Sequence, residues 1–175
     1  MIVKLTGSTT FLVALFLFEV SRNVAGALEA LQTTNDTFVR IGNSYYLIER
    51  KLQKNWFGAY EICRQQQAEL ISLETFDELR LVSEYLLANN IFERYWTSGT
   101  DLGTKGKHVW FSNGQPLSTD LWYGGEPNNK NNEEHCDELG SDFRPTKSPG
   151  MNDRNCNFES SFICEEVQPK YNVCP

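Results

Sequence analysis

Oxygen-bearing side chains that could bind a cation gather in one stretch of the chain, between residues 120 and 156. The candidates there are Glu126, Asn128, Glu134, Asn152 and Asp153. No thiolate or imidazole is in this set, and Ca²⁺ takes six to eight oxygen ligands, whereas Zn²⁺ prefers His and Cys. On spacing alone, a calcium site and an Asn-rich surface loop whose polar residues simply serve turns are equally good interpretations.

Two cysteines lie within this stretch, and pairing them would gather the acids. Glu134 comes two residues before Cys136, and Asp153 comes three residues before Cys156. A disulfide between these cysteines would bring the two carboxylates together, and closing the loop would contribute roughly 3 kcal/mol in the chain-entropy model. Pro127 permits a cis peptide bond, which would turn both flanking side chains toward the same ion.

An enzyme is the competing interpretation for so many carboxylates. A glycosidase that used Glu133 or Glu134 together with Asp137 would need two opposed carboxylates on either side of a cleft. Residues so close together on one loop rarely provide that arrangement. We therefore expect no catalytic residues.

The elements that must position these residues belong to one domain. The chain has 175 residues, 40% of them hydrophobic, which suffices for one well-buried core. Its formal charge of −7 argues against partners held through phosphate contacts, so nucleic acid is excluded.

The first 27 residues are typical of a cleaved secretion signal. Lys4 precedes an apolar run at residues 11–18, and small residues follow at 25–27. The alternative, an uncleaved membrane anchor, is disfavoured because the run covers only about half a bilayer core. We expect a secreted, extracellular protein without a membrane span, followed by an N-terminal segment at 28–40 in which Asn35 begins a glycosylation sequon.

Two helices followed by short strands predict an α+β fold. Asn55 can cap a helix that runs through residue 67, and Thr75 with Glu78 forms a capping box for a second helix that ends near residue 89. The predicted strands are residues 44–49, 95–98, 108–111, 136–139 and 162–165. For all four tryptophans, core packing is favoured over stacking on a ligand.

Several motifs in this order resemble the C-type lectin family over residues 41–166. They are WTSG at 96–99, Glu-Pro-Asn at 126–128, Glu134 before Cys136, Asn152-Asp153 before Cys156, and FICE at 162–165. The resemblance implies a double-loop domain with two helices, small antiparallel sheets and the disulfides Cys63–Cys164 and Cys136–Cys156. Residues 167–175 then form a C-terminal tail.

The resemblance also implies a ligand. In the family, the Glu-Pro-Asn triplet accompanies mannose, glucose, N-acetylglucosamine and fucose, whereas Gln-Pro-Asp accompanies galactose. Two vicinal equatorial hydroxyls of the sugar would complete the calcium shell. Glu126 and Glu134 would accept hydroxyl protons, Asn128 and Asn152 would donate amide hydrogens, and Asp153 would mainly hold the ion.

Three departures from the family pattern refine this expectation. Met151 stands at a usual Trp position, while Asn129 and His135 replace carboxylates that often bind auxiliary calcium, so we expect one ion. His135 is interpreted as a rim residue rather than a ligand. A domain that binds protein without calcium is the runner-up function.

The biological role and the assembly are further predictions. Microbial recognition and agglutination in innate immunity come first, with reproduction or cell adhesion as alternatives. Cys174 has no partner if the two family-like disulfides form. It could join two chains into a disulfide-linked homodimer, or it could carry a small-molecule cap.

Overall fold

The computed structural model describes residues 38–140 and 150–167. The predicted signal segment, Asn35 and Cys174 lie outside these residues. The helices are α2 (Trp56–Gln65) and α3 (Phe76–Ala88), with short 3₁₀ turns η1 (Thr119–Leu121) and η2 (Lys130–Asn132). The strands are β1 (Phe38–Ile41), β2 (Ser44–Lys54), β3 (Ala68–Leu70), β4 (Tyr95–Thr100), β5 (Val109–Trp110), β6 (Cys136–Leu139), β7 (Met151–Arg154) and β8 (Ser160–Glu166).

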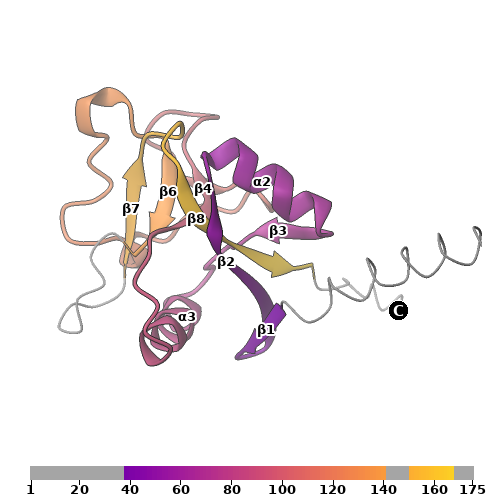
Figure 1. Cartoon of the computed structure of the whole chain (residues 1–175). Helices are drawn as coiled ribbons and strands as arrows, with labels where there is room; N and C mark the ends of the chain where they lie inside the picture. The colour runs from indigo at the N-terminus through magenta and orange to yellow at the C-terminus, as the bar shows by residue number, and fades with distance from the viewer. Residues whose placement is uncertain (1–37, 141–149, 168–175) are drawn as a thin grey trace, which may run out of the picture. The chain divides into compact units, whose positions relative to one another are not determined.

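The strands form one sheet in the order β1-β2-β8-β4-β6-β7, with β3 paired to β8 and β5 to β4 (Figure 1). All pairings are antiparallel except the parallel contact between β4 and β8, where Tyr95 lies opposite Ser161. The sheet thus brings the C-terminal strand β8 to its middle, and the β6–β7 hairpin forms one end.

Each helix begins at a polar cap that the sequence predicts. The Asn55 side chain accepts a hydrogen bond from Gly58 N at 2.9 Å, and Thr75 Oγ1 accepts one from Glu78 N at 3.2 Å. Glu78 Oε2 in turn accepts from Glu74 N at 3.0 Å, one residue before the cap. These bonds satisfy backbone donors that have no partner inside the helix. The buried face of α3 consists of Leu79, Val82, Ser83 and Leu86.

The tryptophans lie in or against the core, as predicted. Trp56, Trp96 and Trp110 are buried, and Trp122 is half-buried and packs against the α3 side of the core. Met151 is fully buried in the same cluster. Its side chain belongs to the core, and its backbone oxygen accepts a hydrogen bond from Tyr123 N at 3.0 Å.

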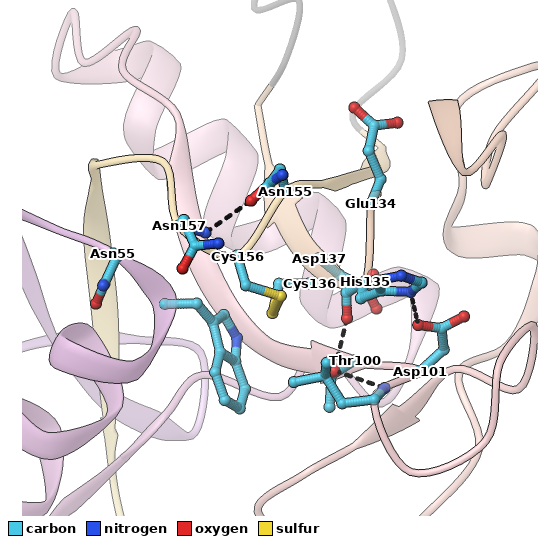
Figure 2. The surroundings of a disulfide bond; sticks show 12 residues. Asn55, Thr100, Asp101, Glu134, His135, Cys136, Asp137, Asn155, Cys156 and Asn157 are labelled. Atoms are coloured by element: carbon cyan, nitrogen blue, oxygen red, sulfur yellow. Dashed lines mark hydrogen bonds and ion pairs between the residues drawn. A yellow bond between two sulfur atoms is a disulfide. The ribbon is translucent and has the colours of Figure 1, made fainter. Parts of the chain in front are cut away.

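Both disulfides have formed as predicted. Cys63–Cys164 joins α2 to β8. Cys136–Cys156 joins the first residue of β6 to the second residue after the end of β7 (Figure 2). The second bridge closes a sequence separation of 20 residues. It therefore fixes the end of the β6–β7 hairpin.

Three strands were not predicted. β1 and β3 are short, and β7 lies in the 120–156 stretch, where only residues 136–139 are predicted to form a strand. The sequence of β7, MNDR, has low strand propensity, and it is extended because it pairs along the whole of β6. In the part of the chain that the structure describes, no helix is both long and apolar enough to span a membrane.

Candidate metal centre

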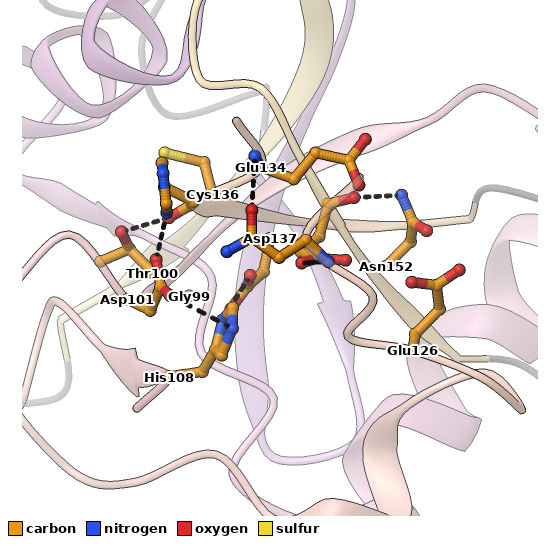
Figure 3. Close-up of polar contacts among 12 residues, drawn as sticks. Gly99, Thr100, Asp101, His108, Glu126, Glu134, Cys136, Asp137 and Asn152 are labelled. Atoms are coloured by element: carbon orange, nitrogen blue, oxygen red, sulfur yellow. Dashed lines mark hydrogen bonds and ion pairs between the residues drawn. The ribbon is translucent and has the colours of Figure 1, made fainter. Parts of the chain in front are cut away.

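The β6–β7 hairpin places the predicted ligands Asn152 and Asp153 beside two acids of β6. In its register Glu138 lies opposite Asn152, and Asp137 lies opposite Asp153. Glu134 comes two residues before β6, and the charge of Asp153 acts on its carboxylate. Figure 3 shows Glu126, Glu134 and Asn152 on one side of this region.

Asp153 holds the preceding loop in place. Its side chain is fully buried, with Oδ1 3.0 Å from Asn128 N and Oδ2 2.7 Å from Asn129 N. Two backbone N–H groups thus donate to one carboxylate, a charge-assisted arrangement that is stronger than neutral hydrogen bonds. The loop that carries the Glu-Pro-Asn triplet is therefore attached directly to β7.

The two polar residues of the triplet face each other. The peptide bond between Glu126 and Pro127 is cis. Asn128 Nδ2 donates to Glu126 Oε1 at 2.8 Å, and Asn128 N lies 3.1 Å from Glu126 Oε2. Asn128 is exposed and Glu126 is half-buried, so both side chains are reachable from solvent.

Glu134 is held by the short turn that precedes it. Its Oε2 accepts a hydrogen bond from Lys130 N at 3.0 Å, and its own N donates to Asn129 Oδ1 at 3.3 Å. Asn129, Asn131 and Asn132 have φ values of 42°, 58° and 60°. Asparagine tolerates this left-handed region better than most residues, which explains its abundance in this loop.

The carboxylates repel one another. Burial raises the pKa of Glu126, and its hydrogen bond and charge interaction with Asp153 raise that pKa further. Burial also raises the pKa of Glu134, with the charges of Asp153 and Glu138 acting in the same direction. A cation between these groups would relieve the repulsion.

The donor set suits a hard cation. It consists of three carboxylates and two amides, and Ca²⁺ binds such oxygens in flexible geometry. Within residues 38–140 and 150–167, no three Asp, Glu, His or Cys side chains form a ready-made metal cluster. The predicted ligands instead bond to neighbouring protein groups, and an arriving ion would replace contacts such as the one between Asn128 and Glu126.

A second layer of charged residues supports the hairpin, and the sequence did not reveal it. Glu138 is fully buried, with Oε2 2.8 Å from Arg154 Nη1 and Oε1 3.2 Å from Asn152 Nδ2. The sequence feature that could have revealed this layer is the pair of acids, Asp137 and Glu138, in the predicted strand 136–139. Side chains at successive strand positions point to opposite faces of a sheet, so one acid lies on each face. Both faces are buried here, so both acids need partners.

On the other face, two histidines alternate with two buried aspartates. His108 Nδ1 lies 2.9 Å from Asp137 Oδ1, and His135 Nδ1 lies 2.8 Å from Asp101 Oδ1. Burial alone would lower the pKa of His108, but the hydrogen bond and charge of Asp137 outweigh it and raise the pKa. Burial raises the pKa of Asp137 to about 6, against the opposing effect of His108. In Figure 2, His135 turns toward Asp101 while Glu134 points away from the disulfide.

This layer also explains the glycine of the WTSG motif. A Cβ atom at Gly99 would collide with Asp137 Oδ2. Only glycine therefore allows β4 to pass beside the buried carboxylate.

Comparison with known proteins identifies the family. The Lectin C-type domain model matches residues 52–166, and the chain belongs to this family. C-type lectin 37Da of Drosophila melanogaster is 38% identical over 132 residues, which cover 73% of this chain and 70% of that protein. The family and this relative are lectins, a class of carbohydrate-binding proteins, and no catalytic family is indicated.

Solved structures share the fold at lower identity. The C-type lectin domain of murine dendritic cell inhibitory receptor 2, solved in complex with N-glycan, has a TM-score of 0.61 and 21% identity, with 75% of this chain and 97% of that chain covered. The herring type II antifreeze protein has a TM-score of 0.61 and 23% identity, with 77% and 98% covered. A lectin and an antifreeze protein both have this fold, so the ligand must be argued from the residues of the site.

Proposed function

We propose that this protein is a secreted, calcium-dependent lectin that binds sugars of the mannose, glucose and fucose type. The observation that supports the proposal is the attachment of the loop that follows Glu126 to the buried Asp153 carboxylate, with Glu134 close enough for the charge of Asp153 to raise its pKa. The negative charge of each carboxylate there makes ionisation of its neighbours less favourable, and one divalent cation would neutralise part of that charge.

The chemistry of recognition follows from the donor set. Asp153 and the oxygens of Glu126, Asn128, Glu134 and Asn152 would hold one Ca²⁺, which supplies a charged centre for two adjacent sugar hydroxyls. A carboxylate can only accept hydrogen bonds, whereas an amide can donate them, so each hydroxyl meets both kinds of group. A sugar whose hydroxyl pair has the wrong orientation leaves polar groups unpaired, which costs about 1 to 3 kcal/mol.

The proposed surroundings are extracellular. The signal segment 1–27 would direct secretion, Asn35 would carry a glycan, and Cys174 would join some chains into dimers. Two linked sites raise avidity on a repetitive surface without new contacts. Glycans of microbial surfaces or host glycoproteins are the proposed partners, with agglutination and innate immune recognition as the proposed role.

The decisive experiment measures retention of the purified protein on immobilised mannose. We expect binding in millimolar Ca²⁺, release by EDTA, and full recovery when Ca²⁺ is restored. Immobilised galactose, matched in density, is the control and should retain much less protein. Binding that persists in EDTA, or binding to neither sugar, would contradict the proposal, and retention of a protein partner in EDTA would support the runner-up.

A further inference from the structure

A pocket of about 370 Å³ lies between the start of α3 and the β1-β2-β8 end of the sheet. The β6–β7 hairpin is at the other end of the strand order (Figure 1). Pockets that bind small molecules begin at about 300 Å³. This pocket is therefore large enough for a small organic ligand, and none of the predicted calcium ligands lines it.

Carboxylates from three separate segments line the pocket. Glu74 precedes α3, Glu78 lies in the first turn of α3, and Glu165 lies on β8 opposite Tyr46 of β2. An acid in the first turn of a helix is favoured by the helix dipole, which accounts for Glu78. It does not account for Glu165, because that residue is on a strand.

No basic side chain in the described part of the chain compensates these acids. The ion pairs found there include none of Glu74, Glu78 and Glu165. Burial and the charge of Glu78 raise the pKa of Glu165 to about 7. Burial also raises the pKa of Glu78, and the charge of Glu74 acts in the same direction. A positive group inside the pocket would oppose these effects.

The hydrogen bonds of the acids indicate which kind of cation fits. Both oxygens of Glu78 already accept hydrogen bonds, one of them from Tyr46 OH at 2.8 Å. Glu165 accepts from the Ser44 side chain and from the Ser72 backbone. The remaining lone pairs are thus spread over several carboxylates. The three hydrogens of an ammonium group can reach such separate acceptors, whereas a planar guanidinium is best matched by one free carboxylate.

A metal ion fits this pocket less well than an organic cation. In the described residues, no three Asp, Glu, His or Cys side chains are placed to hold a metal. The rest of the lining is partly apolar, with Ile41 and Val82 buried and Leu81 exposed. An aliphatic stem could lie along these side chains while its charged end reaches the carboxylates, as lysine side chains do.

We propose that this pocket is a second binding site, which takes an ammonium group carried on an aliphatic stem. The ligand is a free aliphatic amine or the lysine side chain of a polypeptide, since both have this chemistry. The site is separate from the proposed calcium site and does not depend on it.

The test is calorimetric titration of the secreted protein with cadaverine, in Ca²⁺ and at low ionic strength. We expect saturable binding at one site. Glu165→Gln keeps the size of the side chain and should weaken binding about fivefold or more, because one charged acceptor is lost. Glu166→Gln, an exposed neighbour on β8, makes the same change in net charge and should bind like the wild type. Equal weakening in both variants would show that only the overall negative charge attracts the amine, and would overturn the inference.

Three more probes examine the stem and the source of the amine. Pentanol has the stem without the charge and ammonium chloride has the charge without the stem, so each should bind about tenfold or more weakly than cadaverine. A terminally blocked Gly-Lys-Gly peptide that binds as tightly as cadaverine would assign the site to a polypeptide lysine. Binding of cadaverine but not of the peptide would assign it to a free amine. Binding of neither would overturn the inference.

A measurement on the wild-type protein locates the amine without any variant. Backbone amide signals are followed by NMR as cadaverine is added to the Ca²⁺-loaded protein. We expect the signals of Ser44, Glu78 and Glu165 to shift together. Shifts confined to residues 126–134 would place the amine at the predicted calcium ligands and refute the second site.

Discussion

Asp153 Oδ1 accepts a hydrogen bond from Asn128 N at 3.0 Å, across 25 residues of chain. This contact joins β7 to the Glu-Pro-Asn loop through a buried charge. It makes the shape of the loop depend on a residue that is itself a proposed ligand. Loss of Asp153 should therefore affect the metal and the loop together.

The first prediction concerns Asp153→Asn. The variant loses the negative charge. One of the two carboxylate oxygens is replaced by an amide nitrogen, which cannot accept a hydrogen bond from a backbone N–H group. We expect Ca²⁺ affinity to fall by at least tenfold and the free energy of unfolding in EDTA to fall by about 1 to 3 kcal/mol. Calorimetry and urea unfolding measure the two effects, with Asp120→Asn as an exposed control that should change neither.

The second prediction exchanges acid and amide within the triplet. In Glu126→Gln/Asn128→Asp, donors and acceptors change places while the oxygen count is kept. We expect preference to shift from mannose-type to galactose-type sugars with Ca²⁺ binding retained. A glycan array measures the sugar preference. The control is Glu133→Gln/Asn131→Asp, which makes the same exchange at exposed loop positions outside the predicted ligand set and should leave the preference unchanged. Unchanged selectivity of the first variant would contradict the assigned roles.

The third prediction concerns acidification. In the metal-free protein the pKa values of Glu126 and Glu134 lie above the usual value for Glu, so protons compete with Ca²⁺ at a higher pH than for ordinary carboxylates. We expect Ca²⁺ affinity to decrease as the pH falls from 7.5 toward about 5, with proton uptake as the ion leaves. Calorimetry in two buffers of different ionisation enthalpy measures this uptake. Sugar binding that survives after the ion has left would refute the mechanism.

The fourth prediction concerns a carboxylate far from the site. Burial raises the pKa of Glu165 to about 7, and the charge of Glu78 adds to the effect. The folded state thus binds this proton more tightly than the unfolded chain, so the residue's contribution to stability falls as the pH rises from about 4.5 to about 7. Glu165→Gln should stabilise the metal-free protein at pH 8 by on the order of 2 kcal/mol, and should have little effect at pH 4.

Urea unfolding in EDTA at the two pH values measures this difference. Glu166→Gln, an exposed neighbour on the same strand, is the matched control. An equal gain at pH 4 and pH 8 would show that the charge of Glu165 is not the cause.

The fifth prediction concerns Cys174, which lies outside the described residues. If it links two chains, non-reducing electrophoresis of the secreted protein will show a dimer band that disappears in Cys174→Ser. Agglutination by the variant should weaken, because linked sites gain avidity that single sites lack. A dimer band in both proteins, or in neither, would exclude the linkage.

Local signals in the sequence predicted the helices well. Asn55 and Thr75 cap helices because their side chains satisfy the first free N–H groups, an effect confined to a few neighbouring residues. The disulfide pairing came from the family resemblance, since five cysteines can form two disulfides in fifteen ways. The candidate ligands were found because they cluster near Cys136 and Cys156 in the sequence.

Features that depend on distant segments were missed. β7 is a strand because β6 lies beside it, not because its own residues favour extension. The roles of Glu138 and His108 likewise depend on their partners, Arg154 and Asp137, which only the folded sheet brings into contact. A single sequence contains both members of each pair without showing that they meet.

The two ends of the described domain leave from the same part of the sheet. Leu47 on β2 pairs with Phe38 of β1 on one side and with Cys164 of β8 on the other, whereas the β6–β7 hairpin lies at the opposite end of the strand order (Figure 1). A tag or fused partner joined directly to residue 38 or to residue 167 should leave the hairpin free. This geometry would let the domain be immobilised in one uniform orientation on a biosensor surface.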